Sequence, residues 1–155
     1  MEIIWTDGAD ERFLALCAEL DGHLNDAVGG ETQRACYTPL NATVDIHDVV
    51  LLAEDGAALA CGGFKRLDEY TTEMKRVFVR PTSRRRGLGR QVVCLLLGRA
   101  AAAGFQRMVL ETGRVLAEAC ALYEAEGFVV IENYGPYRCM PQSICMEKRL
   151  TPPSI

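Results

Sequence analysis

The spacing of apolar residues along the N-terminal part of the chain predicts a strand followed by a helix. Residues 2–6 (EIIWT) form a short apolar run typical of a strand. Residues 10–20 carry apolar side chains at helical spacing, and the pair Asp21-Gly22 is expected to end this helix. Residues 24–43 show no clear period, so we expect a short second helix followed by a loop there.

Three strands are expected next, the first two forming a hairpin. Residues 48–55 and 57–68 flank the turn Asp55-Gly56, and the pair Gly62-Gly63 indicates a bulge in the second of these strands. The third strand covers residues 71–80 and stops before Pro81. Its side chains are expected to alternate, with one face formed by Met74, Arg76 and Phe78 and the other by Lys75, Val77 and Val79.

Helices and strands alternate in the C-terminal half. The expected elements are a helix over residues 89–103, a strand over 105–112, a helix over 115–127, and strands over 128–134 and 142–150. The antiparallel start followed by this alternation predicts a mixed α/β sheet in one domain, residues 1–150, with a short tail at 151–155.

Composition and charge exclude several classes of protein. The chain has 155 residues, of which 49% are hydrophobic and 25% charged, as in a single soluble domain. Its longest apolar run, residues 92–98, is too short to span a bilayer, and the acidic start has no signal-peptide pattern, so we expect a cytoplasmic protein. A net charge of −4 argues against nucleic-acid binding.

The seven cysteines do not resemble a disulfide framework or a zinc site. Their number is odd and no C-x-x-C pair occurs. Cys17, Cys61, Cys94 and Cys120 lie in apolar segments, and we interpret them as buried thiols. No metal is expected.

The stretch Ser83–Gln91 (SRRRGLGRQ) joins a predicted strand to a predicted helix. At a helix N-terminus the free backbone amides and the positive end of the helix dipole favour an anion, and neighbouring arginines add to this. The segment lacks the G-K-[ST] of a P-loop, and Val92 replaces the third glycine of a dinucleotide-binding motif. The alternative is a solvated basic turn that only connects the two elements.

Two segments carry a resemblance to a known family. The segment VFVRPTSRRRGLGRQVV resembles the acetyl-CoA signature R/Q-x-x-G-x-G/A of the Gcn5-related N-acetyltransferase (GNAT) superfamily, with Arg84, Gly87 and Gly89 in its defining positions. Downstream, ACALYEAEGF resembles the family's A-x-x-L-Y-x-x-x-G-F helix, which contains Tyr123. The sequence departs from the family at Leu116, where an asparagine is common.

The resemblance implies a fold and a cosubstrate. The fold is a single-domain, mostly antiparallel sheet whose two central parallel strands splay apart. The cosubstrate is acetyl-CoA, its pyrophosphate held by backbone amides of the arginine turn, its pantetheine arm paired with the preceding strand, and its carbonyl polarised by the Val79 N–H or a neighbour. The implied binding residues are Val77, Phe78, Val79, Arg84, Arg85, Arg86, Gly87, Leu88, Gly89 and Arg90.

The resemblance also implies direct acetyl transfer to an amine, without a covalent intermediate. Glu73 lies fourteen residues before Gly87, where one branch of the family has its general base. Tyr123 is implied as the acid that protonates the departing thiolate. The alternatives are a solvent-facing Glu73 paired with Lys75 or Arg76, and a Tyr123 that only packs in the core.

The acceptor is expected to contact residues 24–43 and 133–142. In the second segment, Tyr134, Tyr137 and Arg138 suit a carboxylate-bearing amine, although an aromatic turn that packs the sheet edge explains them equally. Without a basic face or tail, we favour a small-molecule amine over a protein, and leave a homodimer open. The rival hypotheses are a non-catalytic acyl-CoA-binding module and an NAD-binding enzyme. The histidines, His23 and His47, are interpreted as surface or loop residues.

Overall fold

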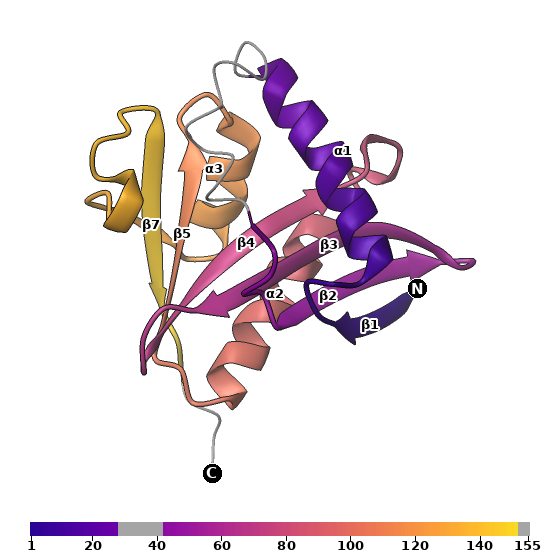
Figure 1. Cartoon of the computed structure of the whole chain (residues 1–155), viewed down its shortest axis with the longest axis horizontal. Helices are drawn as coiled ribbons and strands as arrows, with labels where there is room; N and C mark the ends of the chain where they lie inside the picture. The colour runs from indigo at the N-terminus through magenta and orange to yellow at the C-terminus, as the bar shows by residue number, and fades with distance from the viewer. Residues whose placement is uncertain (28–41, 152–155) are drawn as a thin grey trace.

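The structure, a computed structural model, describes residues 1–27 and 42–151 (Figure 1). Its sheet has seven strands in the order β1-β2-β3-β4-β5-β7-β6. The strands are β1 (Glu2–Thr6), β2 (Asp48–Glu54), β3 (Ala57–Arg66), β4 (Thr71–Val79), β5 (Arg107–Gly113), β6 (Val129–Ile131) and β7 (Ser143–Arg149). The helices are α1 (Glu11–Ala27), α2 (Leu88–Ala102) and α3 (Ala117–Ala125), and 3₁₀ turns cover Pro81–Ser83 and Gly135–Tyr137. This confirms the mixed, mostly antiparallel fold that the sequence predicts.

The central strands β4 and β5 are parallel and separate after three residue pairs. Thr71, Thr72 and Glu73 pair with Arg107, Met108 and Val109, and the remainder of β4 has no hydrogen-bonded register with β5. The other neighbouring strands are antiparallel. The splayed pair expected from the family resemblance is therefore present, and it divides the sheet into β1–β4 and β5–β7.

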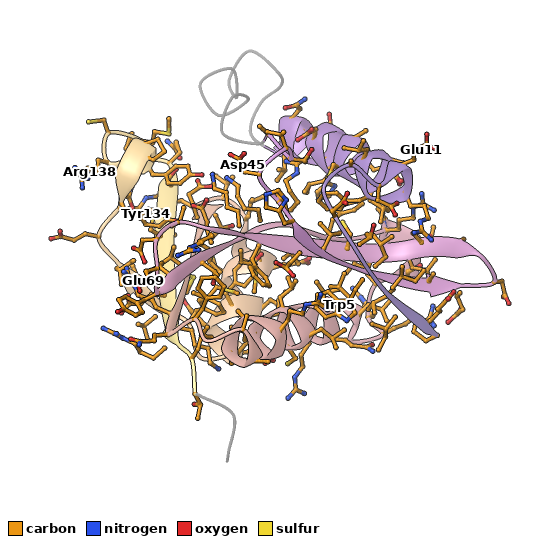
Figure 2. The ribbon with its side chains drawn as sticks, turned by 60° about the horizontal axis from the view of Figure 1, so that its bottom comes forward. Trp5, Glu11, Asp45, Glu69, Tyr134 and Arg138 are labelled. Atoms are coloured by element: carbon orange, nitrogen blue, oxygen red, sulfur yellow. The ribbon has the colours of Figure 1, made fainter. Side chains whose placement is uncertain are left out.

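Helices α1 and α2 cover opposite faces of the β1–β4 part of the sheet (Figure 2). The α1 face is built around Phe13, Leu16 and Leu51, all fully buried. The α2 face is built around Val92 and Leu96, and α3 adds Leu122 and Tyr123 to the same apolar cluster. Burial on two faces explains why β2 reads as a continuous apolar run rather than an alternating one.

A bulge breaks the alternation predicted for β4. Between the pairs Cys61↔Phe78 and Gly63↔Lys75, β3 contributes one residue and β4 contributes two, so the extra residue lies in β4 rather than in β3. As a result Met74 packs on the α2 face and Phe78 on the α1 face, whereas the sequence placed them together. Glycine is required opposite, because a Cβ at Gly62 would lie 2.6 Å from Val92 Cγ1.

Helix α1 continues through Asp21-Gly22, where the sequence analysis ended it. A glycine inside a helix costs only about 1 kcal/mol relative to alanine. Leu20 and Leu24, one turn apart, both pack against the α1 face of the sheet, and this apolar packing extends the helix. The short helix and loop expected after residue 24 fall mostly on residues 28–41, which lie outside the described part of the chain.

Three of the described cysteines, Cys17, Cys61 and Cys145, are buried free thiols. Cys120 is partly buried, and Cys94 is exposed, which corrects the interpretation of Cys94 as a buried thiol. Cys94 lies between Val93 and Leu95 in an apolar run, but it occupies the solvent side of α2, where its Sγ is 3.2 Å from Glu126 Oε2. None of the described helices is long and apolar enough to cross a membrane.

Candidate active site

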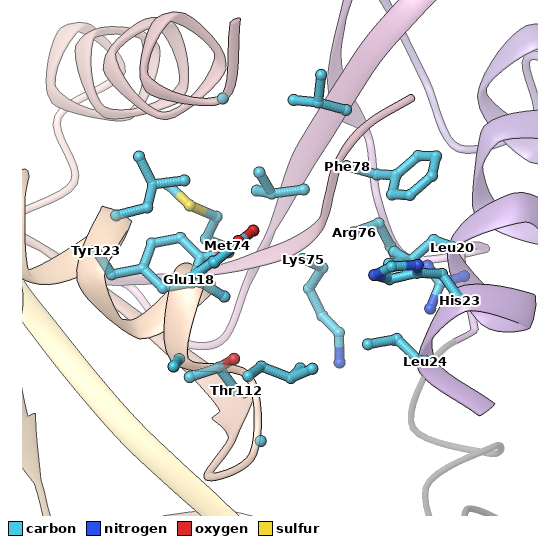
Figure 3. Close-up of a pocket in the computed structure, with 18 of the residues that line it drawn as sticks. Leu20, His23, Leu24, Met74, Lys75, Arg76, Phe78, Thr112, Glu118 and Tyr123 are labelled. Carbon is cyan, nitrogen blue, oxygen red and sulfur yellow. The ribbon is translucent and has the colours of Figure 1, made fainter. Parts of the chain in front are cut away.

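A cavity of about 1370 Å³ opens where β4 and β5 diverge (Figure 3). Its walls come from the last seven residues of β4, the arginine turn, the start of α3 and the C-terminal half of α1. The cavity therefore lies at the junction singled out by the sequence motif.

The arginine turn and the start of α2 form one end of this cavity. Gly87 caps α2 with a left-handed φ of +75°, a conformation that glycine adopts without strain. A Cβ at Gly89 would point toward Leu122 Cδ2 at 3.4 Å, across the cleft between α2 and α3. Of the implied cosubstrate-binding residues, those that line the cavity are Val77, Phe78, Val79, Arg84, Arg85, Gly87, Leu88, Gly89 and Arg90.

Arg84 and Arg86 differ in where their side chains lie. Arg86 is not among the cavity-lining residues, because its guanidinium pairs with Glu54 at 2.6 Å. Arg84 lines the cavity, donates from Nε to the Val79 carbonyl oxygen at 3.1 Å and lies over the Phe78 ring. Arg84 thus braces the end of β4 beside the arginine turn.

Glu73 is buried in the cavity wall, with 3% of its surface exposed. Its Oε2 accepts a short hydrogen bond from the Tyr134 hydroxyl, and its Oε1 lies 3.6 Å from Lys75 Nζ and 3.8 Å from Lys65 Nζ. Glu73 is therefore not the solvent-facing strand glutamate of the alternative interpretation, although Lys75 is one of its partners. A carboxylate held in this way is positioned to accept a proton inside the cavity.

Tyr123 lies on α3, in the opposite wall from β4, and lines the cavity. Its ring packs edge-on against Phe128 with 5.9 Å between the centroids. Desolvation raises the pKa of Tyr123 above its ordinary range, and the nearby Cys120 and Glu111 act in the same direction. The Tyr123 hydroxyl is therefore protonated at neutral pH.

The aromatic turn expected to contact the acceptor is divided between two environments. Tyr134 and Tyr137 point inward, Tyr134 to Glu73 and Tyr137 to Lys75 Nζ at 3.3 Å. Arg138 is exposed at the periphery and does not line the cavity (Figure 2). The carboxylate-binding wall suggested for Tyr134, Tyr137 and Arg138 is therefore not assembled as one surface.

The structure brings forward two residues to which sequence reasoning gave no role in the site, Lys75 and Arg76. Both are nearly buried and both line the cavity. Lys75 is desolvated, which lowers its pKa, while the Glu73 charge opposes that effect. The available signal was a pair of adjacent cations in the middle of a predicted strand.

His23 is exposed, in agreement with its interpretation as a surface residue, and it also lines the cavity from α1. Cys120 does not line it, and its Sγ lies 3.9 Å from the Gly113 carbonyl oxygen.

Among residues 1–27 and 42–151 there is no group of three or more histidine, cysteine or carboxylate side chains able to hold a metal ion.

Comparison with known proteins gives a consistent result. Residues 31–128 match the model of the acetyltransferase (GNAT) family. The "IAA acetyltransferase" of Azospirillum brasilense is 35% identical over 141 residues, which cover 90% of this chain and 92% of that protein.

Solved structures show the same fold. A protein of Klebsiella pneumoniae assigned as an acyl-CoA N-acyltransferase superposes with a TM-score of 0.79 at 28% identity, covering 97% of each chain. A GNAT family acetyltransferase from Elizabethkingia anophelis with acetyl-CoA bound has a TM-score of 0.58 at 19% identity, covering 66% of this chain and 76% of that one.

Proposed function

The chain belongs to the acetyltransferase (GNAT) family, and on that premise we propose that it transfers an acetyl group from acetyl-CoA to the primary amine of a small molecule. The observation that carries the proposal is the cavity between β4 and β5. It has a glycine-rich helix N-terminus at one end and the buried carboxylate of Glu73 at the other. The helix N-terminus suits the phosphates of the acetyl donor, and the Glu73 carboxylate suits an acceptor amine that must lose a proton.

Acetyl-CoA fits the residues that line this cavity. The amides at the start of α2 suit its pyrophosphate, and Arg84, Arg85 and Arg90 supply positive charge around them. The backbone of Val77–Val79 is free of any β5 partner and suits the amides of the pantetheine arm. The Elizabethkingia structure, which contains acetyl-CoA on the same fold, supports this assignment.

Glu73 acts as the general base in this proposal, directly or through one water molecule. An amine with a pKa of about 10 arrives protonated and must lose a proton before its lone pair can attack the acetyl carbonyl carbon. Tyr134 and Lys75 hold the Glu73 carboxylate in place. A backbone N–H of the Val77–Val79 segment stabilises the oxyanion that forms during attack.

Tyr123 completes the reaction as the general acid. Attack forms the C–N bond and cleavage breaks the C–S bond, which leaves a thiolate that needs a proton. The raised pKa of Tyr123 keeps its hydroxyl protonated until that step. The ammonium gives up two protons in all. Glu73 accepts the first before attack and releases it to solvent, and the second, lost from the nitrogen once the C–N bond has formed, restores the Tyr123 hydroxyl after Tyr123 has protonated the thiolate, with no covalent intermediate on the protein.

Two measurements test the proposal. Acetyl-CoA and CoA should raise the melting temperature, since a ligand at a hundred times its Kd adds about 2.7 kcal/mol of stability. Stabilisation by NAD alone would refute acetyl-CoA as the cosubstrate. A screen of amines for CoA release should then find turnover, and binding without turnover of any amine would favour the non-catalytic acyl-CoA-binding module.

A further inference from the structure

Two cationic side chains, Lys75 and Arg76, lie nearly buried in the part of the cavity between β4 and α1. Their side chains are 8% and 4% exposed. Lys75 extends into the open space between Thr112 and Leu24, and Arg76 lies beside His23 (Figure 3). Burying a cation is costly unless it is paired. Lys75 is paired with Glu73 and Arg76 with Asp21, so both cations are held in place in the cavity wall.

The backbone of Arg76 adds to this cost. Arg76 forms the bulge in β4 with a φ of +62°, in the left-handed region that residues other than glycine seldom occupy. A conformation of this kind is energetically unfavourable and is concentrated at functional sites. Its effect here is to turn the guanidinium toward α1.

The guanidinium is fixed but incompletely satisfied. Its Nη2 donates to the Cys17 carbonyl oxygen at 2.9 Å and lies 2.9 Å from Asp21 Oδ1. Its Nε is buried and has no hydrogen-bond partner among the described residues. Leaving a buried donor unpaired destabilises the folded state, and nearly all such groups in native proteins are paired.

A purely structural role explains only part of this arrangement. The ion pair with Asp21 ties α1 to β4, but the Asp21 side chain is 45% exposed, and an ion pair with an exposed partner contributes little to stability. The left-handed φ serves this tie, because it turns the guanidinium toward α1, but the unpaired Nε does not. A guanidinium that is held in the cavity wall with a donor left over is suited to recognising an anion.

We propose that Arg76, with Lys75 and His23, forms a carboxylate-recognition subsite, and that the acceptor is a primary amine that also carries a carboxylate. Guanidinium groups match the planar geometry of carboxylates. Leu20 and Leu24 line the same part of the cavity and suit an apolar side group. The acceptor amine then faces Glu73, the neighbour of Lys75 at 3.6 Å. This inference rests on the proposed function for the identity of the acceptor.

The first test compares matched acceptors that differ only in the carboxylate. Leucine and isoamylamine, and phenylalanine and phenylethylamine, are assayed by CoA release at saturating acetyl-CoA. In the unmodified protein we expect kcat/KM to be at least tenfold higher for the amino acids. Arg76→Gln should lower kcat/KM for the amino acid at least tenfold more than for its plain amine.

Asp21→Asn is the control for a structural role of Arg76. It removes the ion pair that ties α1 to β4 but leaves the guanidinium in place. The preference for the carboxylate should survive in this variant. If Asp21→Asn and Arg76→Gln lose the preference equally, Arg76 acts through the position of α1 and the subsite is refuted.

The second test measures binding without turnover. Phenylacetate and phenylacetamide are titrated calorimetrically into the protein with CoA present, and phenylacetate should bind at least tenfold more tightly. Arg76→Gly, which relieves the strained φ while removing the guanidinium, should abolish that difference. The glycine variant also replaces Arg76→Gln if the latter does not fold.

The outcomes separate the two proposals. Acetylation of amines without regard to a carboxylate, together with equal binding of phenylacetate and phenylacetamide, refutes the subsite and leaves the acetyltransferase proposal standing. Arg76-dependent binding of phenylacetate in a protein that acetylates no amine supports the subsite and refutes the proposed transfer.

Discussion

The Tyr134 hydroxyl donates a hydrogen bond to Glu73 Oε2, joining two residues that are 61 positions apart in the chain. Burial raises the pKa of Tyr134 above its ordinary range, and the Glu73 charge raises it further, so the phenol remains a donor to the carboxylate. The bond links β4 to the loop before β7, across both halves of the sheet. It positions Glu73 for the role proposed above.

Glu73→Gln preserves the size of the side chain and removes the base. We expect kcat to fall by about a hundredfold or more near neutral pH and to recover partly at high pH, where the amine loses its proton unaided. A kcat profile over pH, with acetyl-CoA affinity as a control, measures this. An unchanged rate and profile would show that Glu73 serves only as a partner of Lys65 and Lys75.

Tyr134→Phe is the matched variant for positioning. It removes the donor to Glu73 but leaves the carboxylate, so kcat should fall less than in Glu73→Gln, by about tenfold. A loss as large as that of Glu73→Gln would contradict a positioning role and assign the proton transfer to Tyr134 itself. Steady-state kinetics of the two variants side by side decides the point.

Tyr123→Phe removes the proposed acid. Because the pKa of Tyr123 is raised by burial, its hydroxyl does not ionise in the accessible pH range, and the loss of rate should persist at high pH. The profiles of Tyr123→Phe and Glu73→Gln should therefore differ in shape. Recovery of Tyr123→Phe at high pH would argue that water, not Tyr123, protonates the thiolate.

Gly89→Asp places a carboxylate in the cleft where the cosubstrate phosphates are expected. We expect acetyl-CoA to lose its stabilising effect on the protein, measured by thermal shift. Gly98→Asp is a matched control, since Gly98 lies in the same helix and a Cβ there meets nothing within 4 Å. If Gly89→Asp binds acetyl-CoA as tightly as Gly98→Asp, the arginine turn is not the phosphate site.

Asp10 caps α1 and makes stability depend on pH. Its Oδ1 accepts from the amides of Arg12 and Phe13, and the Arg12 side chain is the main cause that holds the pKa of Asp10 below its ordinary range. Asp10→Ala should cost about 1 kcal/mol at pH 7.

The sign of the Asp10 effect follows from its depressed folded-state pKa. Its contribution is complete above the unfolded pKa of about 3.9 and is lost as pH falls below that value. Urea denaturation at pH 7 and pH 3 should show the difference between Asp10→Ala and the unmodified protein shrinking at pH 3. Asp26→Ala, near the other end of α1, should cost little at either pH, because an acid there opposes the helix dipole.

Sequence patterns predicted this fold where a local signal decides the structure. The limits of β1 agree with the expected strand at Glu2–Thr6, and the glycine turn before α2 lies where its motif predicts. The limit of α1 was missed because the packing of Leu24 against the sheet outweighs the local penalty of Gly22. The spacing of residues in a sequence indicates local helix or strand propensity, and packing against distant parts of the chain can outweigh that propensity.

The site was predictable in part for the same reason. Glu73 and Tyr123 could be named because they keep fixed offsets from recognisable motifs. The extra residue at Arg76 has no local signature, since it is defined by the register of β4 against β3. The partnership of Tyr134 with Glu73 depends on how the last loop folds back over the sheet, which no spacing in the sequence encodes.

Strands β4 and β5 are hydrogen-bonded to each other at only one end. The paired segment of β4 is Thr71–Glu73. Within it, Thr72 is fully buried and donates a hydrogen bond from Oγ1 to the Arg107 carbonyl oxygen at 3.3 Å. Six further residues of β4 extend beyond this segment, roughly 20 Å of strand at about 3.3 Å per residue. Because β4 stays paired with β3 as far as Val79, a change in the angle between β4 and β5 would move the end of β4 together with β3. The pairing at Thr71–Glu73, which includes the proposed base, therefore sets the width of the cleft in which donor and acceptor would meet.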